Sequence, residues 1–149
     1  MPTFIIEHCE PRVYPWCLIE YAHISKIVGK DNLWFTHTKS KKLSSFGTVM
    51  PAAVTALDLK NACVLDPFAK ETLKPDEQFE YYIFGGILGD DPPARKTEQF
   101  ITNKVKWTAR NLGTKQFPTD NAIYVTKKII EGTPLNKMSF HDTLEINLR

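Results

Sequence analysis

Glycines gather directly after an apolar run, and this feature most limits how the chain folds. Gly85, Gly86 and Gly89 follow Tyr81-Tyr82-Ile83-Phe84 within five residues, and they account for three of the seven glycines in the chain. Glycine at this density marks backbone that adopts positive φ or lies flat against another group. A buried strand that ends in such a loop is typical of the ligand-binding edge of an open α/β sheet. The stretch 84–93 is therefore the first candidate site.

Apolar runs alternate with segments of helical periodicity along the rest of the chain. This alternation predicts an α/β fold with a mostly parallel sheet and helices on both of its faces. The expected strands are 3–7, 32–36, 62–65, 80–84 and 105–110, with a final short strand in 133–149. The expected helices are 15–28 with Gly29 as its cap, 51–60, one that starts near Pro92 or Pro93, and one from Thr119 or Asp120 to Gly132.

Composition bounds the class of protein more than it names a function. With 149 residues and 42% hydrophobic content, the chain has the size of one domain, 1–149. A net charge of +2 lacks the excess of a dedicated nucleic-acid binder. Three cysteines without a C-x-x-C pair, and no leader-like start, indicate a reduced cytoplasmic protein. No apolar run approaches the roughly 18 residues that span a bilayer, so we expect no membrane association.

A polar segment after the second expected strand carries Lys39, Lys41 and Lys42. We expect a mobile surface loop there. Such a cluster is either a solvated face or a contact for phosphate or for an acidic partner. The sequence leaves these alternatives open.

Three loops follow expected strands and should emerge at one edge of a parallel sheet. They are 65–67, 84–93 and 111–120. Neither glycine loop matches G-x-G-x-x-G or G-x-x-x-x-G-K-[ST], which removes the usual phosphate cradles. An adenine ring without phosphates would instead need backbone donors and acceptors around an apolar slot, and Ile87, Leu88 and Leu112 supply apolar surface there.

Several motifs together resemble the SPOUT-fold protein arginine methyltransferases. The two loops that carry the likeness are Phe84-Gly85-Gly86-Ile87-Leu88-Gly89-Asp90 with Pro92-Pro93, and Leu112-Gly113-x-Lys115-Gln116-x-x-Thr119-Asp120-x-Ala122. Further agreement comes from Ile5-Ile6-Glu7-His8-x-Glu10, Trp16, Glu20-Tyr21 and Leu65-Asp66-Pro67. The matches span residues 5 to about 130, and their specificity lies in the combination.

The resemblance implies a SPOUT-type fold with a C-terminal trefoil knot, an exception to the rule that chains do not thread their own loops. It also implies an S-adenosylmethionine-dependent enzyme that acts as a monomer and methylates an arginine of a KH-domain protein of the small ribosomal subunit. The knot would involve the loop after the fifth strand. Carried over by position, the residues implied to line the methyl-donor pocket are Leu65, Asp66, Pro67, Phe84, Gly85, Gly86, Ile87, Leu88, Gly89, Leu112, Gly113, Lys115, Gln116, Phe117 and Thr119.

Methyl transfer to arginine requires no metal, because a sulfonium methyl is already activated and needs alignment with its nucleophile. A protonated guanidinium has no acceptor atom, so a carboxylate must hold it and take or relay its proton. The catalytic candidates are therefore the acids beside the expected donor site, namely Glu7, Glu10, Asp90 and Asp91.

Several of these residues also have structural interpretations. Asp90 and Asp91 would stabilise the start of a following helix, and Thr119-Asp120 would cap the last helix. Asp66-Pro67 also suits a strand-ending turn, although its place beside the other loops favours ligand contact. Lys115 suits either a contact to the ligand's carboxylate or a solvent-facing position. His8 beside a buried strand is more typical of a hydrogen-bonded structural residue than of a proton carrier.

The chain departs from the family pattern in two places. Ala94 and Lys96 stand where arginines are expected after Pro93, and the chain ends at Arg149 without the longer extension of such relatives. The second difference bears on the choice of protein substrate. Two other functions stay open from sequence: a SPOUT RNA methyltransferase, with lysines contacting phosphates, and a non-catalytic protein that binds an adenosyl ligand.

Overall fold

The computed structural model describes residues 2–8, 12–85, 97–98, 101–113 and 117–138. Its centre is a six-stranded sheet with the order β3-β2-β1-β5-β4-β6, in which every described pairing is parallel. The strands are β1 (Thr3–Glu7), β2 (Leu33–Thr36), β3 (Thr48–Val49), β4 (Ala62–Leu65), β5 (Tyr81–Gly85) and β6 (Thr108–Arg110). The prediction of a mostly parallel α/β sheet is confirmed.

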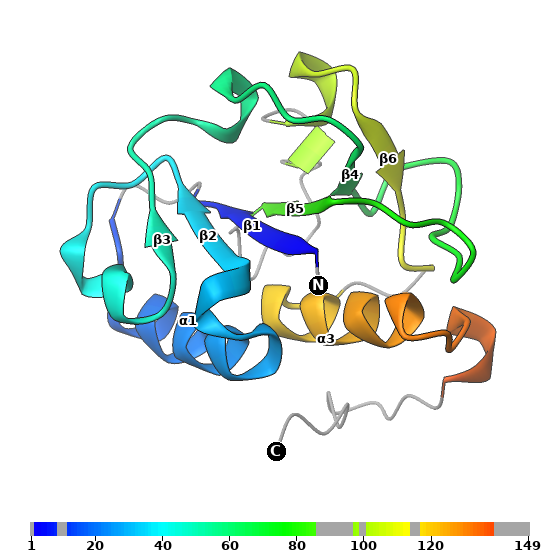
Figure 1. Ribbon diagram of the computed structural model, residues 1–149, viewed down its shortest axis with the longest axis horizontal. Coiled ribbons are helices and arrows are strands. Elements are labelled where there is room, and N and C mark those ends of the chain that lie inside the picture. Colours follow the sequence, from blue (N-terminus) through cyan, green and yellow to red (C-terminus); the bar gives the residue numbers. More distant parts are fainter. Residues whose placement is uncertain (1, 9–11, 86–96, 99–100, 114–116, 139–149) are drawn as a thin grey trace.

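Two helices, α1 (Pro15–Val28) and α3 (Thr119–Ile130), lie side by side against one face of this sheet (Figure 1). Alternate strand residues such as Phe4, Phe35 and Phe84 point to these helices and form the larger core with them. Parallel strands that are buried on both faces consist of continuous apolar residues, and for this reason the sequence predicted most of these strands.

The opposite face carries a smaller core around Ile5, Val64 and Ile83. In the described part of the chain it is covered by 3-10 turns and loop segments, including η3 (Val54–Ala56) and η4 (Thr102–Lys104), rather than by a long helix. The expected helix near Pro92 or Pro93 lies outside the described residues.

Four expectations about local structure need correction. The segment 51–60 forms only the single turn η3, because the backbone N–H of Val54 donates to Glu7 and its side chain is buried in the smaller core. The fifth expected strand, 105–110, corresponds to β6, which begins at Thr108 rather than at residue 105. The strand β3 was not predicted. The segment around the lysines is not a plain loop, since η2 (Lys41–Ser45) buries Leu43 completely.

The ends of the helices agree with the sequence in one case and differ in the other. Helix α1 starts with Pro15 and is followed by Gly29 at φ 90°, as its sequence predicts. Helix α3 has Pro118 rather than Thr119 or Asp120 at its N-cap position, and Pro118 makes no side-chain cap; Asp120 Oδ1 nevertheless accepts a hydrogen bond from the N–H of Asn121 at 2.8 Å in the first turn. Residues 133–138 contain the 3-10 turn η5 (Leu135–Lys137), and the remainder of the expected final strand lies outside the described residues.

Candidate functional site

The neighbouring strands β1 and β5 form a topological switch point. From β1 the chain continues through α1 to β2 and then β3 on one side, whereas β5 is followed by β6 on the other side of the sheet. The last residues of the two strands, Glu7 and Gly85, are paired directly. Ligands of open α/β sheets bind in the crevice outside such carboxyl ends. The start of the glycine loop therefore lies where the fold itself places a ligand.

The loops that the sequence singled out come together at this edge. The hydroxyl of Thr119 donates to the carbonyl of Gly85 at 3.3 Å, which joins the ends of the two glycine loops. Leu65, Phe84 and Leu112 are buried in one cluster, and Phe117 packs against it. The described loop ends thus share one apolar wall beneath α3.

Asp66 is buried and its carboxylate is held within the protein. Oδ1 accepts a hydrogen bond from the backbone N–H of Phe68 at 2.9 Å, and Oδ2 accepts one from the hydroxyl of Thr102 at 2.8 Å. This geometry is that of an Asx-type turn at the end of a strand. Pro67 is exposed beside it. The role of Asp66 and Pro67 in donor binding stays a prediction, alongside a structural role that the geometry supports.

Gly113 has a specific reason to be glycine. Its φ of 88° lies in the left-handed region, and a Cβ built there would come within 2.8 Å of Leu135 Cδ2. Its backbone N–H donates to Asn111 Oδ1 at 2.9 Å. The described contacts of Gly113 are therefore with the protein itself, and its contact with a ligand stays a prediction.

Glu7 is a buried carboxylate at the end of β1. Its Oε1 accepts hydrogen bonds from the hydroxyl of Thr36 at 2.6 Å and from the backbone N–H of Val54 at 2.8 Å. Its Oε2 lies 4.0 Å from His37 Nδ1. Glu7 therefore ties β1, β2 and η3 together at the binding edge. A catalytic role would have to coexist with this structural one.

His8 has the geometry of a structural histidine. It is 3% exposed, its Nδ1 shares a hydrogen bond of 2.8 Å with the hydroxyl of Tyr21, and its Nε2 donates to the carbonyl of Arg12 at 2.7 Å. The donor role of Nε2 leaves Nδ1 as the acceptor in a neutral ring. Both ring nitrogens are occupied, which favours the structural interpretation.

An acidic pair near the start of α3 was not predicted as functional. Burial, and then the nearby carboxylate of Asp120, raise the pKa of Glu20 to about 8. Asp120 Oδ2 lies 3.4 Å from His23 Nδ1. Both residues belong to the motifs that carry the family resemblance, but no local pattern predicts that their carboxylates meet, because they come from helices far apart in the chain. A strongly shifted carboxyl beside a binding edge marks a functional-site candidate.

Asn121, also in the first turn of α3, presents a buried polar atom without a partner. The residue is 3% exposed, and its Nδ2 makes no hydrogen bond in the described part of the chain. Buried donors are nearly always paired in native proteins. An acceptor atom of a bound ligand would satisfy this amide. Together with the apolar wall and the backbone at Gly85, this fits an adenosyl ligand that carries polar groups on an apolar ring.

Part of the predicted site falls outside the described residues. These are the catalytic candidates Glu10, Asp90 and Asp91 and the donor-pocket residues Gly86, Ile87, Leu88, Gly89, Lys115 and Gln116. Among the residues that are described, no group of three or more His, Cys, Asp or Glu side chains could hold a metal ion. None of the helices in this described part has the length and apolar character needed to cross a membrane.

Solved structures first identify the fold. A Trm10 protein from Thermococcus kodakaraensis matches with a TM-score of 0.66 at 17% identity, over 92% of this chain and 96% of that one. Trm10 from Sulfolobus acidocaldarius matches with a TM-score of 0.61 at 11% identity, over 91% of this chain and 62% of that one. At such low identities these matches show a shared fold and nothing about function. They confirm the predicted SPOUT-type sheet.

Closer relatives then identify the family. The protein arginine N-methyltransferase SFM1 of Saccharomyces cerevisiae is 33% identical over an alignment of 161 positions, which covers 93% of this chain and 74% of the relative. The yeast SFM1 structure complexed with SAH has a TM-score of 0.84 at 31% identity, over 94% of this chain and 77% of that one. The complex with SAM has a TM-score of 0.78 at 31% identity, over 95% and 71%.

A family model described as "Protein arginine N-methyltransferase SFM1-like" matches residues 3–149. The chain therefore belongs to the SFM1-like protein arginine N-methyltransferases. At the level of the family, this confirms the predictions of a methyltransferase enzyme and of S-adenosylmethionine as its methyl donor.

Proposed function

We propose that this chain transfers a methyl group from S-adenosylmethionine to an arginine side chain of a small-subunit ribosomal protein, acting as a monomer in the cytoplasm. Family membership supports the enzyme class and the donor. The observation that carries the proposal in the structure is the switch point, where Gly85 opens the glycine loop beside Glu7 and is joined to Thr119. The ribosomal substrate rests on the sequence resemblance.

The donor, when bound, supplies a sulfonium-activated methyl group. The chain's own task is to hold the donor and to exclude water around it. The apolar wall of Leu65, Leu112 and Phe117 would pack against the adenosyl moiety. The Asn121 amide, which has no hydrogen-bond partner among the described residues, would donate to a polar group of the donor. These contacts position the reacting carbon, and positioning can lower a barrier of this kind by about 7–11 kcal/mol in favourable cases.

The acceptor arginine enters as a cation and needs a carboxylate that grips its guanidinium. Glu7 is the candidate for this carboxylate among the described residues. The sequence predicts three further candidates outside the described residues, namely Glu10, Asp90 and Asp91. A bidentate carboxylate would orient one nitrogen toward the methyl group and would accept or relay its proton. We place this role on the carboxylates that flank the β1–β5 junction.

Radiolabelled S-adenosylmethionine, incubated with the purified protein and small ribosomal subunits, tests the substrate. Label in a protein band, and methylarginine in its acid hydrolysate, is the expected result. Label in RNA would overturn the arginine assignment. Donor binding by calorimetry without any transfer to protein or RNA would identify a non-catalytic binding protein.

Single variants then test the carboxylate roles. Glu10→Gln, Asp90→Asn and Asp91→Asn should keep donor affinity, and the variant that loses the guanidinium grip should lose transfer about 100-fold or more. Asp76→Asn is a matched control, because Asp76 is exposed in the segment that precedes the amino end of β5. Full transfer by all three variants and by Glu7→Gln would refute a carboxylate grip at this junction.

The knot, the monomeric state and the location are parts of the proposal with their own measurements. A crystal structure with S-adenosylhomocysteine that traces residues 86–116 would reveal whether the chain is threaded. Sedimentation equilibrium should give the 17.1 kDa mass of one chain. Cell fractionation with an antibody should recover the protein with the cytoplasm, and recovery in an organelle would contradict that part.

A further inference from the structure

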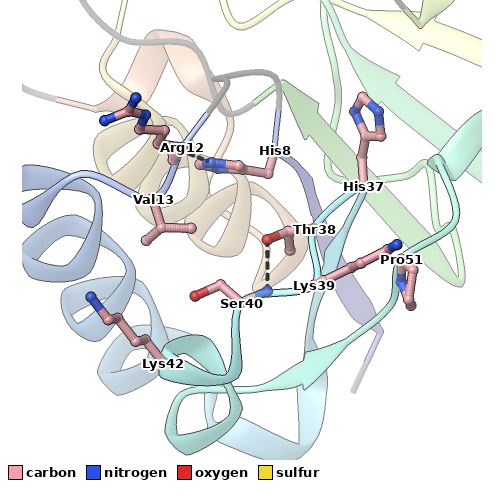
Figure 2. A pocket seen from close by; sticks show the side chains of 9 residues that line it. All are labelled: His8, Arg12, Val13, His37, Thr38, Lys39, Ser40, Lys42 and Pro51. Carbon is pink, nitrogen blue, oxygen red and sulfur yellow. Dashed lines mark hydrogen bonds between the residues drawn. The ribbon is translucent and has the colours of Figure 1, made fainter.

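A hollow of about 480 Å³ opens at the carboxyl ends of β1 and β2, on the side of β1 away from β5. Its described lining comes from the segment after β1, which includes Arg12, from the segment after β2 between His37 and Lys42 without Lys41, and from Pro51 (Figure 2). Of the residues carried over as donor-binding, none that the structure describes lines it. The lysine cluster that the sequence left unassigned thus lies beside a cavity.

Three permanent cations are among the described residues that line this hollow, and none of those residues carries a carboxylate. Arg12, Lys39 and Lys42 are exposed, and no ion pair neutralises them within the described part of the chain. Figure 2 shows them on different sides of the hollow, with Arg12 and Lys42 on one side and Lys39 on the other. Thr38 and Ser40 add hydroxyls to the lining. Unpaired like charges around a cavity create a positive potential that favours an anionic occupant.

The backbone that carries the lysines is held in place. His37 has a φ of 61°, unusual for a residue other than glycine, and its N–H donates to the carbonyl of Ala52 at 2.9 Å. Ser40 N–H donates to the Thr38 hydroxyl at 3.2 Å, and Leu43 anchors the next turn in the core with no exposed surface. Such backbone persists when its surroundings fix it, and it clusters at functional sites. The cations are therefore presented on a defined frame.

The three cations disfavour the target arginine as the occupant, because its guanidinium would meet like charges. A segment with acidic side chains is favoured over RNA by two observations. The described lining contains His8 and His37 but no Phe, Tyr or Trp, so it lacks the large aromatic rings on which successive bases stack. The chain carries a net charge of only +2, whereas binding to a nucleic-acid backbone relies on many cationic contacts.

The sheet register gives the distance between this hollow and the methyl-transfer site. Glu7 is paired with Thr36 of β2 on one side and with Gly85 of β5 on the other. Adjacent strands lie about 4.8 Å apart, so the ends of β2 and β5 are separated by roughly 10 Å. An extended peptide advances about 3.3 Å per residue. A side chain about three residues from the target arginine therefore reaches the hollow.

We propose that this basic hollow binds acidic side chains of the protein substrate, located about three residues from the arginine that is methylated. This inference rests on the proposed function and adds a rule for substrate choice. The cations on opposite sides of the hollow would contact an extended acidic segment at more than one point. The hollow would thus select substrates by charge beside the arginine, while the junction at Gly85 carries out the transfer.

Fluorescence anisotropy with two defined peptides tests the inference without any methyl transfer. One nine-residue peptide carries a central arginine with glutamate three residues away on each side, and the other has glutamine at both places. The wild type should bind the glutamate peptide about three- to tenfold more tightly at low ionic strength, and the preference should shrink at 0.5 M salt. The Lys39→Gln/Lys42→Gln double variant should lose the preference.

Lys41→Gln is the matched control, because Lys41 is exposed in the same segment but does not line the hollow. It should keep the preference, and donor affinity should be unchanged in every variant. Equal binding of the two peptides by the wild type, or an equal loss in the Lys41→Gln control, would overturn the inference. So would a uridine decamer that binds more tightly than the glutamate peptide and depends on the same two lysines.

Charge reversal gives a second, independent outcome. Lys42→Glu should weaken the glutamate peptide further and should favour a peptide with lysine in place of glutamate; indifference to this exchange would contradict the inference. Because these measurements report binding alone, they separate the two ideas. A preference for the glutamate peptide without methylation of any ribosomal protein would refute only the proposed function. Methylation of a ribosomal protein without that preference would refute only the proposal that the hollow binds acidic side chains.

Discussion

Replacement of Glu20 by glutamine should make the protein more stable at neutral and alkaline pH. Burial, and then the nearby carboxylate of Asp120, hold the pKa of Glu20 at about 8, above the value of 4.5 for a free glutamate. The folded protein therefore keeps a proton on Glu20 over a range in which the unfolded chain has lost it. Glutamine keeps the size of the side chain and cannot ionise.

The sign follows from proton linkage. A raised pKa in the folded state contributes stability that is fully present below about pH 4.5 and is lost as the pH rises through about 8. In the intervening range the free energy of unfolding falls by about 1.4 kcal/mol per pH unit. The wild type should therefore lose about 2 kcal/mol between pH 5 and pH 7 from this group, after allowance for its partial solvent contact. For a chain of this size that corresponds to about 4–8 °C in Tm.

Urea denaturation at pH 5, 6, 7 and 8 measures the effect. The Glu20→Gln variant should match the wild type at pH 5 and exceed it by about 2 kcal/mol at pH 7. Glu80→Gln is the control, because Glu80 is exposed, and its curve should run parallel to that of the wild type. Parallel curves for the Glu20→Gln variant and the wild type would refute the buried, protonated carboxyl.

Three further variants test contacts of the fold and the site. Glu77→Gln breaks a bidentate pair, in which Arg110 Nε donates to Glu77 Oε2 at 2.9 Å and lowers the pKa of Glu77. The variant should lose about 1–2 kcal/mol of unfolding free energy at pH 7 in urea titrations. A loss that stays the same as the pH falls through the lowered pKa would be inconsistent with the pair. Thr36→Val removes a donor from the buried Glu7 carboxylate and should cost about 1.5–3 kcal/mol by thermal unfolding, whereas an unchanged Tm would show that Glu7 needs no such support. Gly113→Ala should lower the unfolding free energy by about 1–2 kcal/mol in urea titrations, because alanine is strained at φ 88°. Gly132→Ala is the control, since Gly132 also has a positive φ but open space around it, so any larger loss at Gly113 measures the contact with Leu135. A Gly113→Ala variant as stable as the wild type would contradict the strain.

The sequence predicted elements whose signals are local. The strands Thr3–Glu7 and Ala62–Leu65 were placed to the residue, because strands buried on both faces read as uninterrupted apolar runs. Helix α1 was bounded correctly by Pro15 at its start and Gly29 after its end. The meeting of the three strand-end loops also follows from a parallel sheet, since all carboxyl ends share one edge.

The elements that sequence missed depend on partners far along the chain. Residues 51–60 carry a helix-like start, but Val54 is bound to Glu7 from β1, and this contact replaces the helix. Thr119 has the residue type of an N-cap, yet its hydroxyl donates to Gly85. The shifted pKa of Glu20 arises in part from Asp120 on another helix. No local pattern encodes contacts of this kind.

The pairing of β1 with β5 has a consequence for the time course of folding. Thr3 lies opposite Tyr81, although β2 and β3 are already available to β1 soon after α1. Closing so long a loop carries an entropic cost, and non-local parallel pairing is slow. The half of the sheet with α1 can thus assemble early on a nascent chain. The junction that defines the binding edge forms only after β5 has been synthesised, so donor binding should report late folding events.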